Sequence, residues 1–339
     1  MNATNYIYPV ASLNNGVIIL YIYQQSTTCI ELFEWNTITN TIEQILWSLF
    51  NPAGLQLLPN NVGFSFIDNG RLRVKLFHKR APKAIDFDEP LFHINSLQWI
   101  NEHMCYCSAQ NNDRFSIFEL YDNGVIKCLI TEHDKDFMYP QKINTQIFYI
   151  ERYKKEDSYF YYHIMQMDYP SKKMKMNDTS QATVVASFKN KPIIFLTMES
   201  EQKGFVLEHM DTIEDNSDVM LFYYHCIIKK DNVWQTKYLF SFEIPTYLLL
   251  HGEQSLYESI LPLLPRIINN KIYFVDCSEN KNYNLTPYYY DLTTEQRNKV
   301  IVPEQKGHYF VPMLCGKKMY CGGTKINSTE PLFICNNFN

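Results

Sequence analysis

The sequence lacks the features that would place the protein in a nucleic-acid-binding or membrane-spanning class. It has no long run of basic residues and a formal net charge of −5, whereas nucleic-acid binding needs a basic surface that displaces counterions. Its best apolar stretch, 244–268, is interrupted by Glu253, Glu258, Arg266 and three prolines, so it cannot cross a bilayer. We therefore expect neither a nucleic-acid partner nor a membrane span.

Motifs for catalysis and targeting are missing too. No Gly-x-Ser-x-Gly, P-loop or His-Glu-x-x-His sequence occurs, and segment 1–16 lacks the basic start and apolar core of a signal peptide. Most of the nine cysteines lie in apolar runs, which favours reduced thiols in the cytoplasm. Cys105 and Cys107 share one face of an expected strand and are interpreted as core residues rather than metal ligands. No cofactor is expected.

Aromatic residues and short alternating apolar runs are abundant. Aromatic side chains make up 15% of the chain and hydrophobic ones 46%, which is enough for a sizeable core built from strands. Asn, Asp and Gly form tight-turn signals at 14–16, 68–70 and 122–124, where residues that tolerate positive φ are needed. The pattern predicts an all-β chain. Strand-length runs cover 17–23, 29–35, 71–77, 115–121 and 271–275.

An internal repeat predicts the architecture. Three segments that begin at Pro140, Pro265 and Pro312 align without gaps, each with an aliphatic residue seven positions after the proline and then an aromatic one. A period of roughly 40–50 residues with several short strands per unit is typical of propeller blades. We predict a single β-propeller over 1–339 with seven blades of about four antiparallel strands, six and eight remaining open. Weaker copies start near Val10, Leu57, Leu97 and Ala186.

One interval of the repeat, between the fifth and sixth starts, is longer than the others. It is interpreted as an irregular insertion around 200–262, either one blade with an extra hairpin at 204–210 and a helical excursion near 254–264, which we prefer, or a degenerate eighth blade. The last unit is short. Residues 332–338 are expected to form its third strand and the N-terminal segment 5–8 its fourth, which would close the ring.

Two neighbouring segments carry a resemblance to a known superfamily. Residues 268–276 read Ile-Asn-Asn-Lys-Ile-Tyr-Phe-Val-Asp, residues 288–294 read Tyr-Tyr-Tyr-Asp-Leu-Thr-Thr, and 148–168 is similar. Together they resemble the repeat of TolB-like and other WD40-like propellers, in which a turn, an Ile-Tyr-Phe strand and a Tyr-x-x-Asp-Leu-x-Thr strand recur. The Asp-Gly turn usual in TolB-like repeats is replaced here by Asn269-Asn270. The resemblance implies a fold and no particular activity.

Four histidines and one aspartate are the candidate binding residues. His93, His133, His251 and His308 fall in segments assigned as linkers between blades, and Asp136 follows His133 closely. Such linkers lie on one rim of a propeller, so these side chains are expected at one mouth of the channel. There they would bind a ligand or act as acid and base. The alternative is that the histidines are solvated loop residues. No catalytic or metal-binding residue is assigned.

Three functional hypotheses follow from this fold by analogy, because propellers host many unrelated functions. The leading one is a non-enzymatic binding or scaffold propeller whose partner is another protein, contacted through exposed loops such as 154–157. The second is a hydrolase or lyase that acts on a sugar or peptide in the central channel. The third is a structural subunit of a larger assembly. The sequence leaves the oligomeric state open.

Overall fold

The structure is a computed structural model, and strands make up almost all of its regular secondary structure. Two short 3₁₀ turns, η1 (Pro59–Asn61) and η3 (Thr246–Leu248), are the other regular elements in the described part of the chain. The all-β prediction is confirmed. The structure describes residues 5–13, 15–24, 29–49, 51–61, 63–68, 71–76, 83–85, 92–111, 113–169, 182–210, 218–248, 263–280, 282–303, 307–325 and 331–335.

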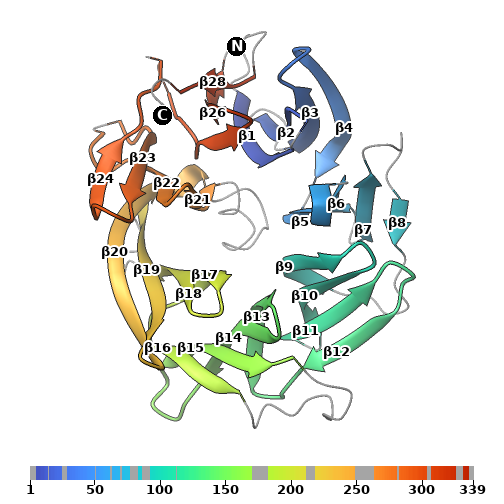
Figure 1. Ribbon diagram of the computed structural model, residues 1–339, viewed down its shortest axis with the longest axis vertical. Coiled ribbons are helices and arrows are strands. Elements are labelled where there is room, and N and C mark those ends of the chain that lie inside the picture. Colours follow the sequence, from blue (N-terminus) through green and yellow to red (C-terminus); the bar gives the residue numbers. More distant parts are fainter. Residues whose placement is uncertain are drawn as a thin grey trace. The chain divides into compact units, whose positions relative to one another are not determined.

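The strands form seven antiparallel sheets, and the fold is a β-propeller in which each sheet is one blade (Figure 1). The chain divides into two compact units. The first comprises Met1–Pro52, Glu214–Met220 and Phe242–Asn339, and the second comprises Ala53–Ile213 and Leu221–Ser241. The predicted fold class and the preferred blade count are both confirmed.

The second unit holds four sheets of four strands each, in which strands that follow one another in the chain are hydrogen-bonded neighbours. The ends of β19 and β20 extend into the first unit. The sheets are β5 (Asn51–Leu57), β6 (Gly63–Asp68), β7 (Arg71–Leu76) and β8 (Lys83–Ile85); β9 (Phe92–Asn101), β10 (Met104–Asn111), β11 (Arg114–Tyr121) and β12 (Ile126–Ile130); β13 (Lys135–Ile143), β14 (Gln146–Lys154), β15 (Phe160–Asp168) and β16 (Thr183–Lys189); and β17 (Ile193–Ser200), β18 (Lys203–Met210), β19 (Val219–Lys230) and β20 (Val233–Pro245).

Polar side chains and apolar packing join the sheets of the second unit to one another. The side-chain oxygen of Gln98 in β9 accepts a hydrogen bond from the Lys142 amide in β13 at 2.7 Å. Gln141 in β13 donates to the Leu196 carbonyl in β17 at 2.9 Å. Cys105 and Cys107 are buried in an apolar cluster that spans the first two of these sheets, so their interpretation as core residues is confirmed.

The first unit holds three sheets. They are β1 (Asn5–Ser12), β2 (Val17–Gln24), β3 (Cys29–Asn36) and β4 (Thr41–Leu49) with β27 (Gly323–Lys325) added beside β1; β21 (Arg266–Ile268), β22 (Lys271–Asp276), β23 (Thr286–Asp291) and β24 (Gln296–Lys299); and β25 (Met313–Cys315), β26 (Lys318–Cys321) and β28 (Phe333–Ile334). A partly buried arginine of β21, Arg266, donates to the carbonyl oxygens of Val311, Pro312 and Pro9, so it links β21 to β1 and to the segment that leads into β25.

The three repeated segments found in the sequence each form the same local structure. The segments after Pro140, Pro265 and Pro312 are the hairpins β13–β14, β21–β22 and β25–β26, each a strand, a polar turn and a strand. In the β21–β22 turn Asn269 and Asn270 both adopt positive φ, which asparagine tolerates better than most residues. The Asp122-Asn123-Gly124 turn is present as well, with Gly124 at φ 90°.

Two strand assignments from the sequence are wrong. Ala186 lies in β16, the last strand of its sheet, and the next sheet starts only at β17, because β16 and β17 are both apolar and only a short polar turn separates them. Residues 204–210 belong to β18, a regular second strand, rather than to an extra hairpin. The interval therefore contains one blade, and the helical excursion near 254–264 lies almost wholly outside the described residues.

The join between the chain's two ends also differs from the expectation. Strand β28 is the third strand of the last sheet, as predicted, but β1 belongs to the first sheet, where it pairs with β2. Strand β27 instead pairs with β1 in antiparallel fashion, with Asn5 opposite Lys325 and Ile7 opposite Gly323. Gly322 has to be small there, because an added Cβ would lie 2.1 Å from the Ile7 carbonyl oxygen.

Candidate functional site

The structure places the five candidate residues in different settings. His93 lies within β9 instead of a linker, and His251 falls outside the described residues. His133 is exposed in the turn before β13, and Asp136 is a buried residue of β13. His308 is buried between β24 and β25, in the first unit. Within the described ranges, no group of three or more His, Cys, Asp and Glu side chains is placed to hold a metal ion.

Asp136 is committed to ion pairs with two arginines of its own unit. Its side chain is only 2% exposed, and its carboxylate accepts hydrogen bonds from Arg152 Nε at 3.0 Å and from a terminal nitrogen of the same arginine at 2.8 Å. Arg114 approaches to 3.3 Å, and the Phe115 amide donates at 3.0 Å. Since Phe115 belongs to the preceding sheet, the carboxylate ties β13 to β11 and is occupied within the fold.

His308 is held as one neutral tautomer. The Leu285 amide donates to its Nδ1 at 3.2 Å, so this nitrogen carries no proton. The proton of the neutral ring is therefore on Nε2, which lies 2.7 Å from the Tyr247 hydroxyl and donates to it. Burial lowers the pKa of His308 to about 4. The imidazole is thus a fixed hydrogen-bond donor at neutral pH rather than a proton shuttle.

Tyr247, in η3, is the accessible member of this pair, since its side chain is 49% exposed. Its oxygen accepts the His308 proton, and its own O–H has no acceptor among the described side chains. Burial raises the pKa of Tyr247 to about 12. The ring of Tyr6 lies edge-on to His308, with 5.9 Å between ring centroids. The cluster offers neutral hydrogen bonding and aromatic surface.

A second candidate surface lies at the β14–β15 hairpin of the second unit. Four aromatic side chains and three lysines gather there, and we call them the aromatic–lysine patch: Tyr153, Tyr159, Phe160, Tyr161, Lys154, Lys155 and Lys189. The Tyr153 and Tyr161 rings stack with centroids 5.6 Å apart. The Lys155 ammonium lies 4.5 Å from the Tyr161 centroid, and Lys189 lies 4.6 Å from that of Tyr159. Tyr159 is nevertheless 46% exposed.

The turn beneath the aromatic–lysine patch is held in one conformation. The Ser158 amide donates to the Lys155 carbonyl at 3.0 Å, and the Tyr159 amide donates to an Asp157 carboxylate oxygen at 3.2 Å. Asp157 also accepts the Tyr161 hydroxyl at 2.7 Å and the Lys189 ammonium at 2.9 Å, and these donors lower its pKa. The turn, the Tyr161 hydroxyl and the Lys189 ammonium are therefore held by contacts within the protein itself.

Sequence reasoning found part of this surface. Segment 154–157 was expected to be an exposed contact loop, and the structure places it in the patch. The role of Lys189 was missed, because it comes from β16 and reaches the hairpin only through the pairing of Tyr161 with Lys189 across β15 and β16. A run of consecutive aromatic residues, 159–161, close to the paired lysines 154–155 was the signal available in the sequence.

The described part of the chain contains no helix that is long and apolar enough to cross a membrane. Comparison with known proteins finds no matching family model and no matching curated protein.

Solved structures do match, at the level of the fold. An oligogalacturonate lyase in complex with manganese aligns with a TM-score of 0.56 and 7% identity over 96% of this chain and 91% of that chain. The propeller domain of the Trilobed protease from Pyrococcus furiosus aligns with a TM-score of 0.55 and 8% identity over 95% of this chain and 99% of that chain. TolB from Acinetobacter baumannii aligns with a TM-score of 0.48 and 12% identity over 91% of this chain and 65% of that chain. The likeness to the lyase and to the protease domain, at 7% and 8% identity, is one of fold.

Proposed function

We propose that the protein is a non-enzymatic binding propeller whose partner is another protein. The aromatic–lysine patch is the observation that carries this proposal. Tyrosine is enriched among the residues that dominate protein–protein affinity, and here Tyr159 is exposed and Tyr161 is partly exposed, both on a turn that is held by its own hydrogen bonds. Lys154 and Lys155 have no ion-pair partner among the described residues, so they favour a partner that presents an acidic segment.

The chemistry of the Tyr247–His308 pair supports a binding role over catalysis. A general acid or base works best when its pKa lies near the operating pH. His308, with a pKa lowered to about 4, and Tyr247, with one raised to about 12, both stay neutral across the physiological range. The lyase and protease among the structural neighbours are too distant in sequence for their activities to be carried over to this chain. The free thiols of the described cysteines support a reducing compartment such as the cytoplasm.

The test is affinity purification of the tagged full chain from its native cell, with quantitative mass spectrometry of the proteins recovered. Two variants address the patch, Tyr159→Ala and the double variant K154E/K155E. The matched control is K229E/K230E, which reverses the charge of two neighbouring lysines at the end of another strand, β19, outside the patch. We expect one stoichiometric protein with the wild-type chain and the control, and about a tenfold lower recovery with either patch variant.

Equal recovery from all variants would overturn the assignment of the patch. Absence of any stoichiometric protein would overturn the protein-binding proposal itself.

A further inference from the structure

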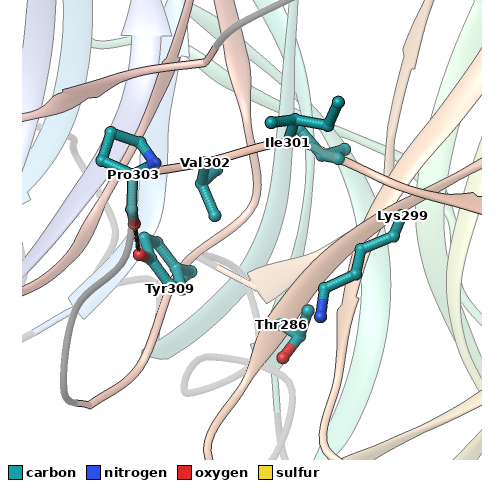
Figure 2. A pocket seen from close by; sticks show the side chains of 7 residues that line it. Thr286, Lys299, Ile301, Val302, Pro303 and Tyr309 are labelled. Atoms are coloured by element: carbon teal, nitrogen blue, oxygen red, sulfur yellow. Dashed lines mark hydrogen bonds between the residues drawn. The ribbon is translucent and has the colours of Figure 1, made fainter.

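A pocket in the first unit has the composition of a small-ligand site. It lies beside β23 and β24 and is lined by Thr286, Lys299, Val300, Ile301, Val302, Pro303 and Tyr309, with a volume of about 380 Å³. Figure 2 shows Val302, Pro303 and Tyr309 on one side, with Lys299 and Thr286 opposite them. Apolar walls with a few polar groups are typical of sites for small organic molecules, and this volume lies within their usual range.

The apolar wall is fixed in place by the fold. The Tyr309 hydroxyl donates to the Pro303 carbonyl, as the dashed line in Figure 2 marks, and the Phe333 ring packs edge-on against Tyr309 at 5.6 Å between centroids. The Tyr309 amide donates to the Leu285 carbonyl at 3.0 Å, and the Val300 amide donates to the Pro287 carbonyl at 2.9 Å. A ligand would therefore meet a preformed apolar surface.

The polar side of the pocket consists of two donors that the fold leaves unused. The Lys299 ammonium has no ion-pair or hydrogen-bond partner among the residues that the structure describes, and the Thr286 hydroxyl has none there either. They come from the paired strands β23 and β24, and in Figure 2 the Lys299 side chain points toward Thr286. A cation and a hydroxyl beside an apolar wall favour a carboxylate, whose two oxygens accept one bond from each donor.

We propose that this pocket binds a carboxylate that is attached to a compact apolar group. The carboxylate pairs with Lys299 and Thr286, and the apolar group packs on Val302 and Tyr309. Two sources carry this chemistry, a small free acid and the last residue of a polypeptide with an apolar side chain. A phosphate fits less well, because it needs more donors than one lysine and one hydroxyl supply. The site is independent of the aromatic–lysine patch, which belongs to the other unit.

The test is titration of the full chain with N-acetyl-leucine, followed by heteronuclear NMR, with N-acetyl-leucinamide as the matched neutral ligand. We expect saturable binding of the acid with a Kd of roughly 1 mM and at least about tenfold weaker binding of the amide. Lys299→Gln should weaken binding of the acid about tenfold, and Thr286→Val about threefold. Lys318→Gln is the control, because this exposed lysine lies in the same unit and outside the pocket.

Equal binding of acid and amide would overturn the proposal, as would wild-type affinity in Lys299→Gln. The proposal would also be overturned if the folded protein bound the acid without chemical-shift changes at Val302 and Tyr309. A second arm compares a five-residue peptide that ends in leucine with its amidated form. Tighter binding of the free-ended peptide than of N-acetyl-leucine supports the site with a polypeptide terminus as its source. Weaker binding of the peptide, with the acid still bound, supports the site with a small free acid as its source.

Discussion

Asp136 and His308 are both buried titratable residues, but the two units of the protein bury them in opposite ways. Asp136 is surrounded by charge, with Arg152 at 2.8 Å and Arg114 at 3.3 Å from one carboxylate oxygen. His308 is surrounded by neutral groups, with a backbone amide at one ring nitrogen and the Tyr247 hydroxyl at the other. One residue is an ion-pair partner and the other is an uncharged hydrogen-bonding group.

The difference shows which neighbours each residue type requires when it is buried. An isolated buried charge costs many kcal/mol, so a carboxylate in the interior needs cations and amide donors around it. An imidazole has a second route, because it can release its proton near neutral pH and keep one donor and one acceptor. Asp276 in the first unit follows the first route, since it accepts bonds from Arg297 at 2.6 Å and from the Glu243 amide at 2.9 Å.

Removal of the Asp136 carboxylate should have the largest effect. Asp136→Ala leaves Arg152 and Arg114 facing each other and the Phe115 amide without its acceptor. We expect the free energy of unfolding to fall by about 3–4 kcal/mol, measured by urea denaturation. Asp134→Ala, which removes an exposed carboxylate from the turn just before β13, should change it by less than about 0.5 kcal/mol. Equal losses in the two variants would contradict the ion-pair assignment.

The second largest effect should be a loss of folding stability in acid, caused by protonation of His308. The unfolded chain binds a proton at a pKa near 6.5, whereas the folded protein resists it until about pH 4. Stability from the neutral imidazole is therefore complete above pH 6.5 and decreases as the pH falls from 6.5 to 4, by up to about 3 kcal/mol. The measurement is the unfolding free energy of wild type and His308→Gln across this range.

The glutamine variant separates this histidine from other titrating groups. Glutamine can accept the Leu285 amide and donate to Tyr247 but does not titrate, so His308→Gln should lose less stability than wild type between pH 6.5 and 4. If the two proteins lose stability in parallel across that window, His308 is not buried as a neutral group.

The smallest effect should come from the outer arginine of the Asp136 site. Arg114 is 44% exposed, and Arg152 continues to donate two hydrogen bonds to Asp136 when Arg114 is replaced. Arg114→Gln should therefore lower the unfolding free energy by less than about 1 kcal/mol, and the loss should shrink further in high salt. Arg152→Gln, measured in the same denaturation series, should cost clearly more. The opposite ranking would reassign the principal partner of Asp136.

Local sequence signals were sufficient for the fold. The Asn269-Asn270 pair predicts a tight turn because both residues tolerate positive φ, and the strands on either side carry their own apolar pattern. Ala186 misled the assignment because β16 and β17 are both apolar strands, and periodicity alone does not tell the end of one sheet from the start of the next.

The candidate sites depended on information that the sequence does not hold. Asp136 was expected at a channel mouth, but Arg152 reaches it across the β13–β14 pair, and Arg114 reaches it from β11 of the neighbouring sheet. His308 was expected to be a binding residue at a channel mouth, but its protonation state is set by Leu285 and Tyr247, which lie far from it in the sequence. Long-range contacts of this kind have no local signature in a single sequence.

The pairing of β1 with β27 has a consequence for synthesis of the chain. The ribosome makes β1 long before it makes the residues that cover the second edge of this strand, Gly323–Lys325. At roughly 5–20 residues per second, that edge stays open for tens of seconds on the nascent polypeptide. An unpaired strand edge is a template for pairing with other chains, so this edge of β1 is an aggregation site until Gly323–Lys325 have been made.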